Sequence, residues 1–509
     1  MIVIIDFGSQ FNQLIARRVR ENKIYCQIIP SDVSIEKIKA LNPQGIILSG
    51  GPSSIYENKS PSIDRKIFDL GVPVLGICYG MHAMIHALDG VIRRAEKKEY
   101  GFAELKIKHH KPLFQGLDNT LQCWMSHGDS PEKLPSGFES IAFTENTENA
   151  AIADFKNDFY GLQFHPEVEH TNQGSFMIKN FLFNVCQCTE NWTMGSFADK
   201  TIKQIRDKVK GDKVIMGLSG GVDSSVAASL IHKAVGKNLH CIFVDNGLLR
   251  KNEKADLKKN LGSSLDMNIK FVDARKKFLS ALKGVSKPEQ KRKIIGNLFI
   301  EVFESEASKI DNAKFLGQGT LYPDIIESKS AFGGPTSIIK SHHNVGGLPE
   351  KMKLHLIEPL DLLFKDEVRK LGLNLGLNKD LVFRQPFPGP GLAIRIMGEI
   401  TEKRLSILRN ADAIVLEEIR ASGMYRKLWQ SFAVLLPIKS VGVMGDKRTY
   451  DNCIAIRAVN SNDAMTADWA KLPHDLLGRI SNRIINEVDH VNRVVFDITS
   501  KPPGTIEWE

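Results

Sequence analysis

Short apolar runs alternate along the chain with longer segments in which apolar residues recur at helical spacing. Within residues 1–190 the runs are rich in β-branched side chains and predict β-strands at residues 2–5, 45–48, 72–77 and 161–164. A second series follows a polar stretch at residues 189–199, with runs at residues 213–218, 239–244, 269–272 and 314–316. Strands separated by helical patterns are typical of α/β folds with parallel sheets. The pattern predicts two doubly wound α/β domains.

The last part of the chain has a different pattern. Prolines and glycines interrupt regular structure at residues 384–391. Beyond them, an amphipathic helical pattern at residues 476–488 is combined with strand-like runs at residues 433–436, 452–459 and 493–498. This mixture predicts a smaller α+β domain. A chain of 509 residues has the length of about three domains, and we place them at residues 1–190, 191–385 and 386–509.

Composition narrows the class of partner. Hydrophobic residues make up 42% of the chain and charged residues 25%, which is ordinary for a globular protein. The net charge of +9 is moderate, and the lysines and arginines are spread along the chain without a long basic tail. This distribution favours small anionic ligands over nucleic acid.

Other features indicate the compartment. The seven cysteines are odd in number and form no C-x-x-C pair, which favours a reducing environment over a disulfide framework. The apolar run at residues 2–5 has no basic leader and meets Asp6 at once, so it predicts a first strand rather than a signal peptide. Residues 71–88 carry no charge, but their proline, glycines and histidines argue against a membrane span. We therefore expect a cytoplasmic protein.

One seven-residue run has the composition of a phosphate-binding loop: Ser219, Gly220, Gly221, Val222, Asp223, Ser224 and Ser225. It joins the strand at residues 213–218 to a helical pattern at residues 226–235, so its backbone amides converge near a helix N-terminus. No Gly-Lys-Ser/Thr follows, which disfavours a Walker A loop. The run resembles the signature of the ATP pyrophosphatases, and this resemblance implies ATP binding by all seven residues and transfer of AMP.

The first domain carries a second candidate site around Cys78. The residues Gly76-Ile77-Cys78-Tyr79-Gly80 follow a predicted strand and precede a helical segment, a spacing that resembles a nucleophile elbow. A helix N-terminus stabilises a thiolate and offers amides to an oxyanion. We expect the backbone of Tyr79, together with that of Gly51 in a glycine turn at residues 49–52, to form an oxyanion site.

His165 and Glu167 follow the predicted strand at residues 161–164 and complete a nucleophile, base and orienting group with Cys78. A His-x-Glu pair also occurs in zinc deaminases, but the Pro-Cys-x-x-Cys partner of that class is absent from the sequence. Together the motifs resemble the class I glutamine amidotransferases. The resemblance implies that glutamine is hydrolysed through a thioester and that ammonia is released.

Over its whole length the chain resembles one family of bacterial ligases, which hydrolyse glutamine and use ATP to convert xanthosine 5'-monophosphate (XMP) to GMP. The landmarks lie at residues 6–10, 319–324, 340–344, 386–391 and 501–509. The family resemblance implies glutamine, ATP and XMP as substrates, Mg²⁺ with ATP, adenylation of XMP with release of pyrophosphate, and a homodimer assembled through the C-terminal domain. From the charge distribution and the absence of a span-like segment we expect neither a nucleic acid nor a membrane as partner.

The same resemblance assigns further residues. It implies that Asp223 helps to position the metal and that XMP is bound by Arg292, Gln430, Lys501, Ile506 and Glu507. Arginine and lysine suit a phosphate monoester, whereas glutamine and glutamate suit the polar edge of a purine. The glycine-rich segment at residues 330–351 is expected to act as a lid that excludes water, with contacts from Lys340, His342 and His343.

Three positions depart from the family pattern. His82 stands where the elbow helix usually has glutamine, Gln385 stands where histidine is usual, and Asp361 stands where arginine is usual. None is a member of the Cys78, His165 and Glu167 set. The first departure predicts altered glutamine binding with ammonia-dependent synthesis preserved.

Two other functions remain open at this point. A tRNA-modifying thiolase would also use the loop at residues 219–225 and would suit the basic charge, but it needs a catalytic cysteine near the ATP site, and Cys241 in a predicted strand suits that role poorly. A non-catalytic glutamine or nucleotide sensor would not need intact Cys78, His165 and Glu167.

Overall fold

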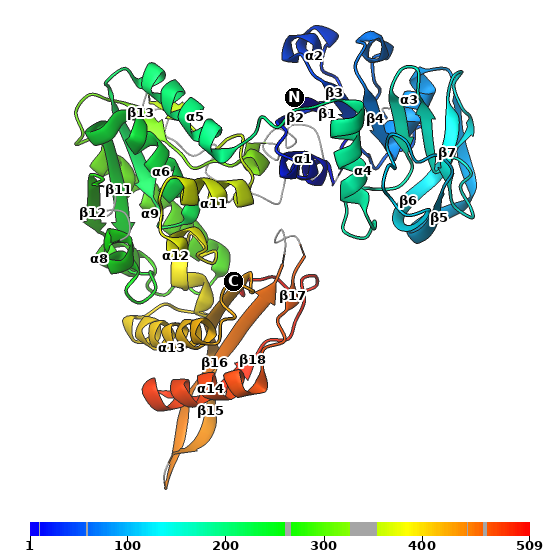
Figure 1. Cartoon of the computed structure of the whole chain (residues 1–509). Helices are drawn as coiled ribbons and strands as arrows, with labels where there is room; N and C mark the ends of the chain where they lie inside the picture. Colours follow the sequence, from blue (N-terminus) through cyan, green and yellow to red (C-terminus); the bar gives the residue numbers. More distant parts are fainter. Residues whose placement is uncertain (10, 58–59, 260–265, 326–353, 445, 462–465) are drawn as a thin grey trace. The chain divides into compact units, whose positions relative to one another are not determined.

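The computed structural model describes residues 1–509 except residues 10, 58–59, 260–265, 326–353, 445 and 462–465 (Figure 1). The chain divides into two compact units, Met1–Thr193 and Met194–Glu509. The division of the second unit into an ATP-binding part and a C-terminal part remains a prediction.

The first unit is built on a nine-stranded mixed sheet with the strand order β2-β1-β3-β4-β9-β8-β7-β5-β6. The parallel strands are β1 (Ile2–Asp6), β2 (Cys26–Pro30), β3 (Gly45–Leu48), β4 (Val74–Ile77) and β9 (Phe159–Leu162). The antiparallel part contains β5 (Val91–Ile107), β6 (Thr120–Lys133), β7 (Glu139–Phe143) and β8 (Ala151–Asp154). The central parallel strands are continuous apolar runs because both of their faces are covered.

The helices of the first unit are α1 (Asn12–Glu21), α2 (Ile35–Leu41), α3 (Tyr79–Ala87) and α4 (Gly174–Asn180), with a short η1 (Arg65–Asp69) and η2 (Phe181–Val185). Helix α3 packs against strands β3, β4 and β9 and has buried side chains along most of its length. The carboxyl ends of β3 and β4 and the start of α3 therefore meet in one place.

The second unit begins with a five-stranded parallel sheet of strand order β12-β11-β10-β13-β14. Its strands are β10 (Lys213–Leu218), β11 (Leu239–Asp245), β12 (Ile269–Asp273), β13 (Ala313–Gly317) and β14 (His355–Ile357). The accompanying helices are α5 (Met194–Val209), α6 (Val222–Val235), η3 (Gly236–Asn238), α7 (Glu253–Leu257), α8 (Arg275–Ala281), α9 (Pro288–Ala307), α11 (Lys365–Asn374) and α12 (Lys379–Val382).

A second sheet completes this unit. It contains β15 (Gln430–Met444), β16 (Lys447–Asn460), β17 (Asp468–Trp469) and β18 (Val491–Phe496), of which β15 and β16 form a long antiparallel hairpin. Helices α13 (Glu402–Ala421) and α14 (His474–Glu487) pack against this sheet and each other, and η5 (Gly391–Arg395) precedes them (Figure 1). Among the described residues, no helix is long and apolar enough to cross a membrane.

The structure confirms the predicted fold class of two α/β sheets followed by a smaller α+β part. Some predicted bounds are wrong. Strand β9 ends at Leu162, two residues before the predicted end, and α5 begins at Met194 inside the polar stretch at residues 189–199 that separates the two series of strands. Helix α6 begins at Val222 instead of residue 226, because Gly221 with an extended backbone (φ −78°, ψ 161°) already serves as the N-cap.

Candidate functional site

Cys78 lies at a sharp turn between β4 and α3. Its backbone has φ 50° and ψ −109°, a strained conformation for a residue with a side chain. The turn is fixed by a hydrogen bond from the Cys78 amide to the Leu162 oxygen at 2.7 Å, which ties it to the end of β9. Such strain is typical of a nucleophile presented at the start of a helix.

Glycines on both sides of Cys78 are required by close packing. A Cβ on Gly76 would lie 2.7 Å from the backbone of Met81, and a Cβ on Gly80 would overlap the Leu48 oxygen of β3. Alanine at either position would force α3 away from the sheet. The spacing of the two glycines in the sequence therefore indicates that the N-terminus of α3 packs closely against β3 and β4.

His165 and Glu167 form a buried pair beside Cys78. The His165 Nδ1 and the Glu167 Oε1 are 2.7 Å apart, and both side chains are almost fully buried. Burial alone would lower the pKa of His165, but the charge of Glu167 and hydrogen bonds to Cys78 and Glu167 raise it well above its ordinary value. Because Glu167 occupies Nδ1, Nε2 is the ring nitrogen left for the sulfur.

The predicted oxyanion residues also lie at this place. A Cβ on Gly50 would be 3.1 Å from His165 Cε1 and 3.8 Å from Cys78 Cβ, so the glycine turn packs between the two side chains. Tyr79 is the first residue of α3, and its amide has no partner within the helix. Gly51 packs against the Tyr79 ring.

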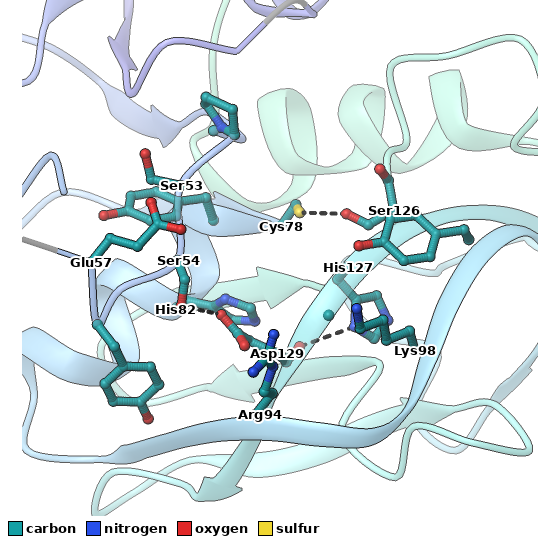
Figure 2. A pocket seen from close by; sticks show the side chains of 16 residues that line it. Ser53, Ser54, Glu57, Cys78, His82, Arg94, Lys98, Ser126, His127 and Asp129 are labelled. Carbon is teal, nitrogen blue, oxygen red and sulfur yellow. Dashed lines mark hydrogen bonds between the residues drawn. The ribbon is translucent and has the colours of Figure 1, made fainter.

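A cavity of about 440 Å³ opens at Cys78 (Figure 2). The Cys78 sulfur is 3.7 Å from the Ser126 backbone oxygen of β6, and His82 and Asp129 line the same cavity below Cys78 in the view of Figure 2. Both signs of charge line the cavity, with Arg94 and Lys98 as cations and Glu57 and Asp129 as anions. A lining of this kind suits a small zwitterion.

His82, the first departure from the family pattern, lines this cavity and is buried. Its Nε2 lies 2.7 Å from the Oε1 of Gln163, another buried residue. Burial lowers the pKa of His82 to about 4, with the charge of His127 acting in the same direction and the Gln163 hydrogen bond and Asp129 opposing it. The ring is therefore neutral near pH 7 and engaged with Gln163.

The predicted phosphate loop links β10 to α6. Gly220 has φ 76°, and its oxygen accepts from Arg384 Nη1 at 3.0 Å. Ser219 and Ser224 are joined through their hydroxyls at 3.1 Å, and the Ser225 hydroxyl donates to the Gly221 oxygen at 2.8 Å. Since α6 begins at Val222, three predicted ATP residues (Asp223, Ser224 and Ser225) belong to its first turn rather than to a loop. The buried Val222 side chain leaves only its backbone for a ligand.

Asp223 fits a role at a metal-nucleotide site. Its Oδ2 is paired with Lys365 at the start of α11, whereas its Oδ1 is buried without a hydrogen-bond partner. The described residues contain no group of three or more histidine, cysteine, aspartate or glutamate side chains placed so that it could hold a metal ion. Mg²⁺ in nucleotide sites usually takes only one or two carboxylates, together with phosphate oxygens and water, so a single carboxylate with a free oxygen suits it.

The residues assigned to XMP lie mostly on and around segment 499–509. Glu507 accepts from Gln430 Nε2 at 2.7 Å and from Arg395 Nε and Nη2 at 3.0 and 2.8 Å. Ile506 is buried in a small apolar cluster. Arg292, in α9, donates to the Glu509 oxygen at 2.5 Å. Lys501 pairs with Ala467 through its backbone. The structure thus brings Gln430 and Glu507 together directly, and Arg292 to the same segment.

The other two departures have plain structural roles. Gln385 is buried; its Oε1 accepts from the amide and hydroxyl of Ser431, and its Nε2 donates to the Tyr425 oxygen. Asp361 is half-buried, and burial together with the charge of Glu358 raises its pKa. The predicted lid residues Lys340, His342 and His343 lie outside the described residues.

Several residues at these sites were missed by the sequence analysis. Arg395 contacts Glu507, Glu509 contacts Arg292, Lys291 contacts Glu509, and Lys365 contacts Asp223. Ser126 and Asp129 line the Cys78 cavity. None belongs to a short motif with a mechanism, and most are separated from their partners by more than a hundred residues, so local pattern gave no signal for them.

Three family models match the chain. Glutamine amidotransferase class-I matches residues 3–185, NAD synthase matches residues 197–299, and GMP synthase C terminal domain matches residues 417–508. The first match contains the Cys78, His165 and Glu167 set. The second contains the loop at residues 219–225, and the third contains segment 499–509 up to Trp508.

Curated relatives match over the full length. The chain is 58% identical over 508 residues to the protein named GMP synthase [glutamine-hydrolyzing] of Brachyspira hyodysenteriae, covering 100% of this chain and 99% of the relative. Proteins of the same name from Carboxydothermus hydrogenoformans and Maridesulfovibrio salexigens are each 57% identical, with the same coverage.

Proposed function

The chain belongs to the family of glutamine-hydrolysing GMP synthases, and on this premise we propose how its residues divide the reaction. The enzyme hydrolyses glutamine to ammonia and uses ATP to adenylate XMP, and ammonia converts the adduct to GMP with release of AMP. The observation that carries the division is that one chain holds both a strained cysteine elbow and a phosphate loop, in separate compact units.

In the first unit, the Cys78 sulfur attacks the amide carbon of glutamine. His165, held by Glu167, takes the thiol proton and gives it to the leaving ammonia as the carbon–nitrogen bond breaks. The amides of Tyr79 and Gly51 stabilise the negative oxygen of the tetrahedral intermediate. Water then hydrolyses the thioester and releases glutamate.

The cavity supports glutamine as the substrate because the amino acid carries an ammonium and a carboxylate. Asp129, which accepts from the Ser54 hydroxyl at 2.5 Å, and Glu57 offer negative charge, and Arg94 and Lys98 offer positive charge. A cavity of about 440 Å³ is large enough for one amino acid.

In the second unit, the C2 oxygen of XMP attacks the α-phosphorus of ATP, and pyrophosphate leaves. The amides and hydroxyls of residues 219–225 bind the pyrophosphate, and Lys365 adds a cation beside Asp223. Bound Mg²⁺, held by Asp223, would neutralise phosphate charge. Ammonia then attacks C2, the carbon–oxygen bond to AMP breaks, and GMP forms.

For XMP binding, Arg292 is proposed to contact the phosphate and Gln430 and Glu507 the purine edge, with Lys501 and Ile506 beside them. The support is that Glu507 is held by a fully buried arginine, Arg395, in a bidentate arrangement. A glutamate held in this way has a fixed carboxylate orientation toward the purine of XMP.

The thiolase alternative is disfavoured by the chemistry of Cys241. This residue is buried inside β11, and burial raises its pKa to about 12, so it is a poor nucleophile. Absence of tRNA retention on a filter at moderate salt is the expected result, because binding driven by phosphate contacts would be visible there and would fall steeply with added salt.

A single-turnover assay with glutamine, ATP, Mg²⁺ and XMP tests the proposed function. We expect one GMP, one glutamate, one AMP and one pyrophosphate per cycle. Glutamine hydrolysis without GMP would contradict the proposal, and binding without turnover would identify a sensor.

Exchange of His82 for glutamine is expected to lower the KM for glutamine, while ammonia-dependent synthesis is unchanged. The reason is that His82 directs its Nε2 to Gln163, whereas a glutamine side chain offers both a donor and an acceptor to the cavity. Steady-state kinetics of His82→Gln against wild type measure the effect, with His86→Gln, an exposed position of the same helix, as the matched control. An unchanged or higher KM in His82→Gln would contradict the explanation.

We also propose that the enzyme is a cytoplasmic homodimer. Exposed apolar side chains gather on the hairpin of β15 and β16, where Ile438, Val441, Val443 and Tyr450 are 54%, 48%, 76% and 63% exposed. An apolar patch of this kind is typical of a protein interface.

Sedimentation at micromolar concentration is expected to give a dimer, and Val443→Glu is expected to shift it toward monomer. Phe176→Glu, an exposed apolar position in α4, is the control and should leave the dimer intact. A wild-type monomer would overturn the proposal.

A further inference from the structure

Segment 499–509 is held by three basic side chains that are themselves fully buried: Arg457, Arg395 and Lys291. Arg457 donates to the oxygens of Thr499 and Thr505 at 2.5 and 3.1 Å. Arg395 binds Glu507 and Lys291 binds Glu509. The proposed XMP function explains why Glu507 is fixed, but it gives no role to Glu509.

Glu509 is surrounded by hydrogen-bond donors although it is not among the proposed XMP residues. Its Oε2 is paired with Lys291 Nζ, and its Oε1 accepts from the Gly398 amide at 3.2 Å. Its backbone oxygen accepts from Arg292. The Glu509 side chain is 3% exposed, so the carboxylate is committed to these groups.

Lys291, the partner of Glu509, also has all of its hydrogen-bond donors engaged. Lys291 Nζ donates hydrogen bonds to the Ala393 oxygen at 3.2 Å and to the Ile396 oxygen at 2.7 Å. Its third N–H donates to the Glu509 carboxylate. Burial lowers the pKa of Lys291, and the hydrogen bond and charge of Glu509 oppose that shift. A buried charge that loses its partner is strongly destabilised, so the two side chains depend on each other.

The ion pair joins the two sides of the proposed XMP site. Lys291 precedes Arg292 on α9, and Glu509 stands two residues after Glu507. Each partner therefore lies within two residues of a residue assigned to XMP, and the ion pair, together with the hydrogen bond from Arg292 to the Glu509 oxygen, ties α9 to segment 499–509.

We propose that Glu509 is a positioning residue for XMP, which fastens segment 499–509 to α9 through Lys291 and thereby places Glu507 opposite Arg292. The inference rests on the proposed XMP site. Glu509 itself does not touch XMP, since its side chain is 3% exposed, whereas that of Glu507 is 18% exposed. Its removal weakens binding of XMP in the ground state and the transition state alike, which raises KM and leaves kcat largely unchanged.

The test compares ammonia-dependent kinetics of Glu509→Gln and wild type. We expect the KM for XMP to rise about tenfold or more, with the KM for ATP and kcat close to wild type. Glu509→Asp, which keeps the charge on a shorter side chain, should lie between the two. Glu487→Gln, on the exposed face of α14, is the matched control and should match wild type.

Two further measurements separate positioning from general damage. The KM for XMP of the double variant Lys291→Met/Glu509→Gln should be no higher than that of the single variant with the higher KM. The reason is that either change alone already breaks the ion pair. Hydrogen exchange of segment 499–509 should be faster in Glu509→Gln, while glutamine hydrolysis by the first unit stays normal. Additive losses, or equal losses in the KM values for XMP and ATP, would overturn the inference.

Failure of this inference is distinguishable from failure of the proposed function. A wild-type enzyme that does not aminate XMP would refute the function itself. An active wild type with an unchanged KM for XMP in both Glu509→Gln and Glu509→Asp would refute only the role of Glu509.

Discussion

Cys78→Ala is expected to lose glutamine-dependent GMP synthesis by about 10⁴-fold or more, while ammonia-dependent synthesis remains within about twofold of wild type. The reason is that the Cys78 sulfur forms the thioester in the first unit, whereas the phosphate loop belongs to the second. Alanine removes the nucleophile and keeps the small size that the strained turn requires. The measurement is initial rate of GMP formation with saturating glutamine or with ammonium salt.

Cys123→Ala is the matched control for this experiment. Cys123 is also a buried thiol of the first unit, and burial raises its pKa to about 12. Its loss should leave both activities in place. Equal loss of both activities in Cys78→Ala would contradict the division of the reaction between two sites.

Asp223→Asn is expected to lower glutamine-dependent and ammonia-dependent synthesis together, by about 10³-fold or more. Asparagine keeps the shape of the side chain but removes its negative charge, which pairs with Lys365 and makes the free Oδ1 a suitable ligand for a cation. The rate of ammonia-dependent GMP formation at saturating Mg²⁺, ATP and XMP is the measurement.

Asp207→Asn, on the exposed face of α5, is the control for the loss of one carboxylate. It should retain both activities. If Asp223→Asn kept ammonia-dependent synthesis, the proposed role of Asp223 beside the metal would be wrong.

The parts of the fold that could be predicted from the sequence are those determined by residues close together in the chain. Strand β10 has the predicted bounds because its apolar run ends abruptly at the serine and glycine residues of the loop. The elbow at Cys78 could be predicted because its two glycines lie close to it in the sequence. Gly76 is required by its contact with the Met81 backbone, and Gly80 by its contact with Leu48 of the neighbouring strand.

The start of α6 was misplaced for an equally local reason. The serines and aspartate after Gly221 were interpreted as loop, since such residues disfavour helix interiors. In the structure Asp223, Ser224 and Ser225 occupy the first turn of the helix, where the Ser224 and Ser225 hydroxyls donate to the Gly221 oxygen.

Long-range side-chain partners lay beyond sequence reasoning. Lys291 and Glu509 are separated by 218 residues and Arg395 and Glu507 by 112. No periodicity links such pairs, and only the fold brings them together. The family resemblance supplied Glu507 and Arg292, but the buried residues that hold them became visible only in the structure.

The central claim is that this enzyme activates XMP by transfer of AMP, and XMP labelled with ¹⁸O at C2, supplied with ATP, Mg²⁺ and ammonia, tests it most directly. Mass spectrometry of the spent nucleotide is predicted to find the label in AMP, with one unlabelled pyrophosphate for every GMP. Label in orthophosphate, with ADP as the other product, would contradict the claim.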